Sequence, residues 1–284
     1  MKKNKGPLYI VIAALLWSTG GFLAKLIPWN AFSIGIIRGS IAAFVQLLYR
    51  RKFFKITKPI LLTALCYFGV TTLFMLANKM TSAGSAIVLQ HTSPLYVALF
   101  SYLFLKKKPS KHQLFCGVAI FTGVLLSMLG SMSSASGNNP VLGNLLALLS
   151  GVFYAGVFFT SRLPGSDALA STILGNSFYL VCSPFLLMDN AFMHPAAGSS
   201  QMVIWAAALF LGFFQLGVAY IFFSEGIKTT DSLQASFIAT LEPVLNPILA
   251  FFILGERMDM LSICGSVLVI GSIILNNYFS EEAS

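Results

Sequence analysis

Long apolar stretches alternate with short polar connections along the whole chain. A helix needs about 20 apolar residues to cross the roughly 30 Å of hydrocarbon in a bilayer. Ten stretches approach that length, over residues 8–26, 31–49, 59–78, 82–105, 113–130, 141–161, 168–188, 202–224, 232–254 and 260–278. None shows the period-two alternation of a membrane strand. The pattern predicts an all-α membrane protein with ten transmembrane helices.

Composition supports this class. Of 284 residues, 57% are hydrophobic and only 10% are charged, which leaves too little polar surface for a soluble domain. The four cysteines all fall within predicted spans, and no pair has metal-ligand or disulfide spacing. We therefore expect no metal and no cofactor. The expected partners are a small-molecule substrate and the lipid bilayer, for a monomer or homodimer.

The net charge of +9 would suggest nucleic acid in a soluble protein, but its placement here follows the membrane. Of the 18 Lys and Arg residues, 14 lie on the same side as the N-terminus and three on the other. The positive-inside rule then places both termini in the cytoplasm of a plasma (inner) membrane protein, and we expect no nucleic-acid partner. Arg38 alone lies within a span, either as a fixed structural group or as a substrate-anion site.

Two segments, residues 79–123 and 228–271, resemble each other. A shift of 149 residues aligns Lys79 with Lys228, Thr81 with Thr230, Ala86 with Ala235, Pro94 with Pro243 and Leu105 with Leu254. Five crossings separate the two copies, so they must run in opposite directions. The sequence therefore predicts two inverted five-helix repeats, residues 1–135 and 136–284.

The first helix of each half fits the same scheme. With Pro28 laid on Pro164, Gly20 meets Gly156 and Trp17 meets Phe153. Inverted repeats of this kind let many transporters expose one central site alternately to each side. The duplication thus favours transport over catalysis or a structural role.

The residues around the prolines are similar to a known family. The motifs are Gln90-His91-Thr92-Ser93-Pro94, Leu241-Glu242-Pro243, Leu254-Gly255-Glu256-Arg257, Leu16-Trp17, Arg38 and Ser161-Arg162. They resemble the EamA family of the drug/metabolite transporter superfamily. The resemblance implies ten helices in two inverted repeats and a central cavity lined mainly by helices one, three, four, six, eight and nine. It also implies movement of small metabolites, usually outward. His91 stands where relatives often have tyrosine.

Glu242 is the one carboxylate deep within a span. An unpaired charge there costs at least about 2.5 to 3.5 kcal/mol. Pro243 and Pro247 remove backbone donors and free nearby carbonyls, and Asn246 shares the helix face with the carboxylate. Two interpretations stay open: Glu242 binds a substrate amine or cation or takes up a proton, or it pins the broken helix through hydrogen bonds.

Gln90 and His91 occupy the matching place in the first repeat, opposite Ala239 and Thr240. A histidine at this depth titrates near neutral pH or donates to a substrate carboxylate; the alternative is a fixed hydrogen bond to a neighbouring helix. Gln90 and His91 are therefore candidates for the substrate cavity. His91 is, with Glu242, also a candidate for proton coupling.

Further candidates lie near the middle of other spans. Trp17, Phe153 and Tyr154 are away from the interfaces where aromatic residues concentrate, and form either two aromatic walls of a cavity or ordinary packing. Thr71 and Gln215 are polar candidates for the same cavity, with interhelical hydrogen bonds as the alternative.

These residues indicate a secondary transporter that moves an amino acid or similar amphipathic metabolite, in the export direction, by alternating access. Pro94, Pro243 and Pro247 would act as hinges of the gating helices. The alternatives are an uptake carrier or a passive facilitator. An intramembrane enzyme with His91 and Glu242 as acid and base is the weakest reading, because no nucleophile motif or metal cluster accompanies them.

Overall fold

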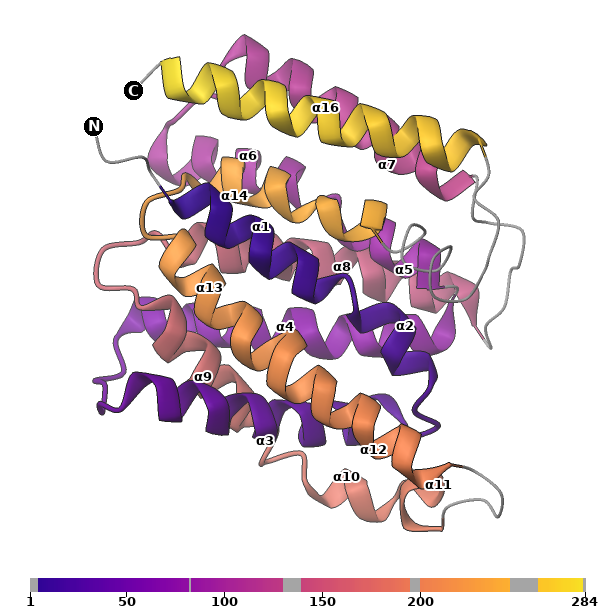
Figure 1. Ribbon diagram of the computed structural model, residues 1–284. Helices are drawn as coiled ribbons and strands as arrows, with labels where there is room; N and C mark the ends of the chain where they lie inside the picture. Colours follow the sequence, from indigo (N-terminus) through magenta and orange to yellow (C-terminus); the bar gives the residue numbers. More distant parts are fainter. Residues whose placement is uncertain (1–4, 82, 130–138, 195–199, 246–259, 283–284) are drawn as a thin grey trace.

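The computed structural model describes residues 5–81, 83–129, 139–194, 200–245 and 260–282 (Figure 1). The helices of the first half are α1 (Gly6–Trp17), α2 (Gly20–Lys25), α3 (Ala31–Arg50), α4 (Lys58–Met80), α5 (Ala83–Gln90), α6 (Ser93–Leu105) and α7 (Lys111–Leu129). Those of the second half are α8 (Pro140–Thr160), α9 (Ala168–Phe178), α10 (Pro184–Leu187), α11 (Asn190–Met193), α12 (Gln201–Phe210), the π-helix η1 (Leu211–Val218), α13 (Ala219–Gly226), α14 (Ser232–Ala239) and α16 (Met260–Glu282). No strand occurs over these ranges, so the all-helical class is confirmed for them.

Polar side chains fix where several helices begin. An N-cap side chain accepts a hydrogen bond from a free N–H of the first turn, which stabilises the helix by about 1 kcal/mol. The capping residues are Asn30 before α3, Thr57 before α4, Asn139 before α8, Asp167 before α9 and Asp231 before α14. These caps set the ends of the long helices at the two ends of the bundle.

The first and fourth predicted spans are interrupted near their middle. Between α1 and α2, the hydroxyls of Ser18 and Thr19 donate to carbonyls three residues earlier, each at 2.7 Å, which competes with helical hydrogen bonding. Between α5 and α6, Thr92 donates in the same way at 2.7 Å, and Pro94 has no N–H to continue the ladder. Neither span is a single helix.

The seventh predicted span, residues 168–188, was wrong as one continuous helix. The helix α9 ends at Phe178, and a series of turns leads to the short α10. Pro184 stands in the first turn of α10. Because proline has no N–H to donate to a preceding carbonyl, it is tolerated at the start of a helix and cannot continue an earlier one. Tyr179, just past α9, is held by a 3.0 Å hydrogen bond to the hydroxyl of Thr71.

Basic residues gather at one end of the bundle, which we call the basic end and define by Arg50, Lys58, Lys107, Arg162 and Lys228. Hydrogen bonds join the segments there: Arg50 to Asp167 at 2.7 Å, Arg162 to the carbonyl oxygen of Ile227 at 3.0 Å, and Lys107 to Asp231 at 2.8 Å. The two ends of the chain lie on this side as well (Figure 1).

Helices in corresponding places of the two halves run in opposite directions. At the basic end α3 finishes where α9 begins, through Arg50 and Asp167, and α6 finishes where α14 begins, through Lys107 and Asp231. The ring of His112, in the first turn of α7, lies 5.6 Å from that of Phe279 near the end of α16. Figure 1 shows α7 and α16 side by side along one edge of the bundle.

Contacts between helices repeat in the two halves. The helix α4 packs on α8 as α13 packs on α1, and α5 packs on α8 as α14 packs on α1. A Cβ added to Gly20 would lie 2.7 Å from Gln215 Nε2, and one added to Gly156 would lie 2.7 Å from Cys66 Sγ. Because Gly20 aligns with Gly156, and Cys66 with Gln215 at the 149-residue shift, these two contacts are equivalent.

Four described helical stretches are long and apolar enough to cross a membrane, judged by length and composition: Ala31–Arg50, Lys58–Met80, Val141–Thr160 and Gln201–Gly226. Half of the most apolar part of each is buried; the other half presents apolar side chains outward. Examples are Phe44, Leu65, Leu145 and Leu209. Exposed apolar side chains on all four stretches are typical of helices that contact lipid.

The contact between α8 and the break after α5 yields a stability prediction. A Cβ on Gly151 would lie 2.8 Å from the carbonyl oxygen of Gln90 and 3.1 Å from that of Leu89. Backbone gives way less easily than a flexible side chain, so we expect Gly151→Ala to destabilise the protein by about 1–3 kcal/mol, measured by thermal unfolding in detergent.

Gly271→Ala is the matched control, because it makes the same change in a helix where no atom lies within 4 Å of the added Cβ. Alanine favours a helix over glycine by about 1 kcal/mol, so this variant should be neutral or slightly stabilised. Equal unfolding temperatures for the two variants would contradict the close approach at Gly151.

Candidate functional site

His91 and Glu242 meet in the interior of the bundle. His91 lies in the break between α5 and α6, and Glu242 lies just past the end of α14, in residues 241–245 that continue as helix. His91 Nε2 is 3.6 Å from Glu242 Oε2, and the two side chains are 0% and 9% exposed. A protonated imidazole would form an ion pair with the carboxylate at this distance. The structure thus brings together the two residues predicted for proton coupling.

The orientation of the imidazole defines which nitrogen is available. His91 Nδ1 is 2.7 Å from the carbonyl oxygen of Ile87; a carbonyl only accepts, so Nδ1 carries the hydrogen. Nε2, which faces Glu242, is buried and has no hydrogen-bond partner in the described part of the chain. Nε2 is therefore the ring nitrogen left to interact with a ligand group, next to the carboxylate.

An aromatic cluster packs beside this pair. The ring of Tyr154 lies edge-on to that of His91 at 5.8 Å, and Trp17 contacts both Tyr154 at 6.1 Å and Tyr220 at 4.9 Å. Trp17, Tyr154 and Tyr220 are each buried, and both tyrosines lie within electrostatic range of Glu242. Trp17 Nε1 is a further buried donor left without an acceptor over the described ranges.

Tyr220 was not among the residues that the sequence predicted. It lies on α13, it contacts Trp17, and its ring centroid is 4.7 Å from that of Tyr67 on α4. The repeat contained the signal for it, because Tyr220 is the equivalent of Thr71 at the 149-residue shift.

The remaining predicted residues are more dispersed. Thr71 donates to the carbonyl of Tyr67 at 2.9 Å and accepts from Tyr179, so its hydroxyl is used in interhelical packing. Phe153 packs against Gly69 on α4 and also borders the apolar core that contains Trp17 and Tyr154.

Two predicted glutamines are buried near helix irregularities. Gln90 ends α5, and its carbonyl faces Gly151. Gln215 lies in the π-helix η1 and packs on Gly20 at the start of α2. Its Oε1 has no partner among the residues that the structure describes. π-helical turns are frequent at functional sites. Asn246 and Pro247 lie outside the described residues.

A family of membrane carriers matches this chain twice. The model of the EamA-like transporter family fits residues 4–129 and again residues 141–278. The chain belongs to the EamA-like transporter family. With its lipid-exposed apolar helices, it is a multi-pass membrane protein of a transporter family.

Several individual proteins are similar over most of this EamA-like chain. An uncharacterized transporter from Clostridium kluyveri is 26% identical and aligns over 98% of this chain and 94% of its own. The uncharacterized inner membrane transporter YicL of Salmonella typhimurium is 25% identical over 96% and 95%. The UDP-galactose/UDP-N-acetylglucosamine transporter srf-3 of Caenorhabditis elegans is 24% identical over 80% and 63%. A solved crystal structure superimposes with a TM-score of 0.78 over 99% of both chains at 17% identity, which shows a shared fold.

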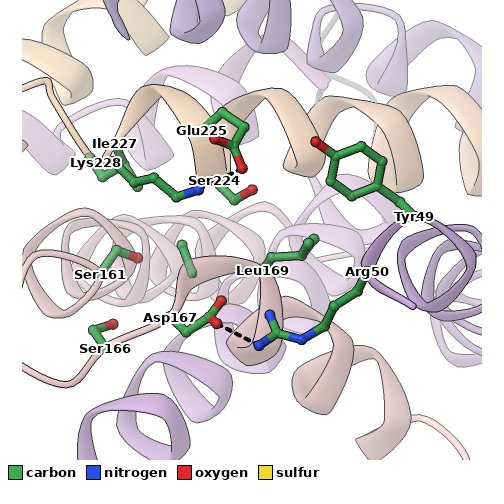
Figure 2. A pocket seen from close by; sticks show the side chains of 11 residues that line it. Tyr49, Arg50, Ser161, Ser166, Asp167, Leu169, Ser224, Glu225, Ile227 and Lys228 are labelled. Atoms are coloured by element: carbon green, nitrogen blue, oxygen red, sulfur yellow. Dashed lines mark hydrogen bonds and ion pairs between the residues drawn. The ribbon is translucent and has the colours of Figure 1, made fainter. Parts of the chain in front are cut away.

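This EamA-like protein has an open cleft at its basic end. The cleft has a volume of about 580 Å³, and its walls come from the end of α3, the loop after α8, the start of α9 and the end of α13. Figure 2 shows Arg50 and Asp167 on one wall and Glu225 with Lys228 on the other. The hydroxyl groups of Ser161 and Ser166 also line it.

The corresponding place at the opposite end of the bundle is closed by packing. Trp29, before α3, lies edge-on to Phe192 and to Trp205, each at 5.0 Å, and is only 3% exposed. The backbone N–H of Asn30 donates to the buried carboxylate of Asp189 at 2.7 Å. Over the described residues, the EamA-like chain thus has a cleft at its basic end and aromatic packing around Trp29 at the other.

Potential metal ligands are scattered over the fold. Over the ranges that the structure describes, no three His, Cys, Asp or Glu side chains come together in a group that would hold a metal ion. The groups that the central site offers to a ligand are the imidazole of His91, the carboxylate of Glu242 and the aromatic rings beside them.

The ion pair of the cleft gives a pH prediction. Burial by itself would raise the pKa of Asp167, but hydrogen bonds from Arg50 and the Ala170 N–H, with the charges of Arg50 and Lys228, leave that pKa below its usual range. The pair therefore contributes stability above the unfolded-state pKa of about 3.9, and that contribution is lost as pH falls through the lower folded-state value.

Asp167→Asn tests this, because asparagine keeps the N-cap of α9 and removes the charge. From pH 7 to 5 we expect the variant to be less stable than the natural protein by less than about 1 kcal/mol, since the pair is partly exposed. The difference should begin to shrink as pH falls below about 4 and should vanish below the lowered folded-state pKa of Asp167. Thermal unfolding in detergent measures it; a difference that persists at the lowest pH would assign the effect to packing.

Proposed function

We propose that this protein is a secondary transporter that exports an amino acid or similar amphipathic metabolite by alternating access through a central site. The observation that carries the proposal is the buried pair of His91 and Glu242, 3.6 Å apart at the meeting point of two interrupted helices. An ionisable pair inside a membrane protein marks a substrate or proton pathway more often than a structural feature.

We further propose that the chain crosses the membrane ten times, as two inverted sets of five helices in residues 1–135 and 136–284. The opposite directions of equivalent helices, the repeated contacts and the two family matches support this arrangement. The hinges would be Pro94 and Pro243, near the two residues of the pair, with Pro247 four residues after Pro243 in the sequence.

The basic end is the proposed cytoplasmic end. Cytoplasmic connections carry an excess of Lys and Arg. At this end Arg50 and Lys107 form ion pairs between segments, and the start of α1 and the end of α16 lie on the same side. This orientation supports a plasma (inner) membrane protein with cytoplasmic termini. The cleft of about 580 Å³ then opens to the cytoplasm.

In the proposed cycle, the cleft is the route to the central pair. Ser224 lines the cleft, and Tyr220 lies four residues earlier on the same face of α13. Tyr220 in turn contacts Trp17 within the central cluster. A solute that enters from the cytoplasm would therefore reach the aromatic cluster first, while the packing around Trp29 keeps the far side closed.

The charge of the central pair favours substrates that carry an amine or another positive group. A buried carboxylate beside an imidazole attracts an amine or other cation and disfavours a substrate with two negative charges. We accordingly place this chain's substrate among amines and zwitterions rather than among nucleotide sugars such as those named for srf-3. Uptake and passive facilitation are the alternatives, and transport measurements separate them from export.

Replacing Glu242 with Gln tests the site. In proteoliposomes, we expect Glu242→Gln to lower saturable exchange of the transported amine or amino acid at least about tenfold, since a charge-assisted hydrogen bond is lost. The pH dependence of the residual transport should also flatten. Asp231→Asn is the control, because it removes a carboxylate that is exposed and paired with Lys107 at the surface while asparagine still caps α14.

Three outcomes would contradict the proposal. An unchanged rate and pH profile in Glu242→Gln would make the carboxylate a structural group. Flux that never saturates and never accumulates substrate would indicate a passive facilitator. Net movement into preloaded cells, instead of out of them, would reverse the assigned direction.

A further inference from the structure

Arg38 is a buried cation with an incomplete set of hydrogen-bond acceptors. It lies in the middle of α3 and is only 2% exposed. Its Nη2 donates to the carbonyl oxygen of Thr71 at 3.2 Å, and its Nε is buried without an acceptor in the described part of the chain. A guanidinium carries five N–H donors. One helix carbonyl and an unpaired Nε therefore leave part of its bonding capacity unmet, and its charge without an ion-pair partner among the described residues.

No carboxylate forms an ion pair with Arg38 over the described ranges. The groups that surround it are neutral: the hydroxyls of Thr71 and Tyr179 bond to each other at 3.0 Å, and the hydroxyl of Tyr67 donates to Asn176 at 2.9 Å. A buried charge without a counter-charge is strongly destabilising, so this position is suited to a negative group that is not part of the described chain.

Arg38 belongs to the face of α3 that points to the central cluster. Ala42, one turn further along the same face, is fully buried in the apolar core that contains Trp17, Tyr67 and Tyr220. Tyr220 lies within electrostatic range of both Arg38 and Glu242, and its ring is 4.7 Å from that of Tyr67. Tyr220 therefore lies near both the buried cation and the buried carboxylate, and Tyr67 lies beside it.

We propose that Arg38 binds the carboxylate of a zwitterionic substrate whose amino group is held by Glu242, so that the protein selects α-amino acids over the corresponding amines. The fork of the guanidinium matches a carboxylate with two parallel hydrogen bonds. The Tyr67–Tyr220 contact separates the two charges in the closed centre and opens when substrate enters. This inference rests on the proposed function, because it takes the His91–Glu242 site as the amine-binding half.

Three compounds with one side chain provide the test: L-leucine, L-leucine methyl ester and 3-methylbutylamine. All three carry the amine, and only leucine carries a free carboxylate. Counterflow of each radiolabelled compound into proteoliposomes of the natural protein should give a half-saturation concentration for leucine at least about tenfold lower than for the other two, as expected for a charge-assisted bidentate contact.

Arg38→Gln should raise the half-saturation concentration for leucine by about tenfold or more and leave those for the ester and the amine unchanged. Arg38→Lys keeps the charge without the fork and should retain part of the preference for leucine. Monodisperse elution and thermal unfolding in detergent establish that each variant is folded. If Arg38→Gln does not fold, the comparison of the three compounds on the natural protein and on Arg38→Lys still decides.

The possible failures are distinct. Equal weakening of all three compounds by Arg38→Gln, or no preference for leucine in the natural protein, would overturn the role of Arg38. If 3-methylbutylamine still exchanges in a Glu242-dependent way, the proposed function stands even though the proposed role of Arg38 does not. If none of the three compounds exchanges saturably, both proposals fail together.

Discussion

A charge removed from water inside a bilayer must be paired, and this constraint organises the interior of the protein. His91 and Glu242, which come from opposite halves of the chain, lie 3.6 Å apart and would form an ion pair with the imidazole protonated. The hydrogen on His91 Nδ1 is committed to the Ile87 carbonyl, so the remaining nitrogen must face the carboxylate. The pairing therefore depends on where α5 stops and on which way its last turn points.

The interruption of α5 also fixes the surrounding helices. Pro94 offers no N–H to the carbonyl of Gln90, and that carbonyl instead approaches the backbone of α8 at Gly151. Tyr154 follows three residues later on α8 and brings its ring against His91. One missing backbone donor thus links the broken helix, the close approach of its neighbour and the aromatic wall of the site. A change at any of these points would disturb the pair.

Symmetry of the fold and asymmetry of its ends have different sources. The helices α3 and α9 occupy equivalent places, and each begins with a polar cap, Asn30 or Asp167. At the basic end Asp167 meets Arg50 beside an open cleft. At the other end the connection before Asn30 is covered by the packing of Trp29. Under the proposed function, a cleft at one end and aromatic packing at the other would correspond to one state of an alternating-access cycle.

The sequence by itself determined the class of the protein, because the length and apolarity of its spans follow from the thickness of a bilayer. It also marked both members of the central pair, since a carboxylate and a histidine beside repeated prolines stand out in apolar sequence. It did not determine the partners of those residues. The division of the seventh span, the packing of Phe153 on Gly69, and the places of Tyr220 and Arg38 depend on contacts between segments far apart in the chain. Helical periodicity specifies only which side chains share a face; the packing of one helix on another decides what that face meets.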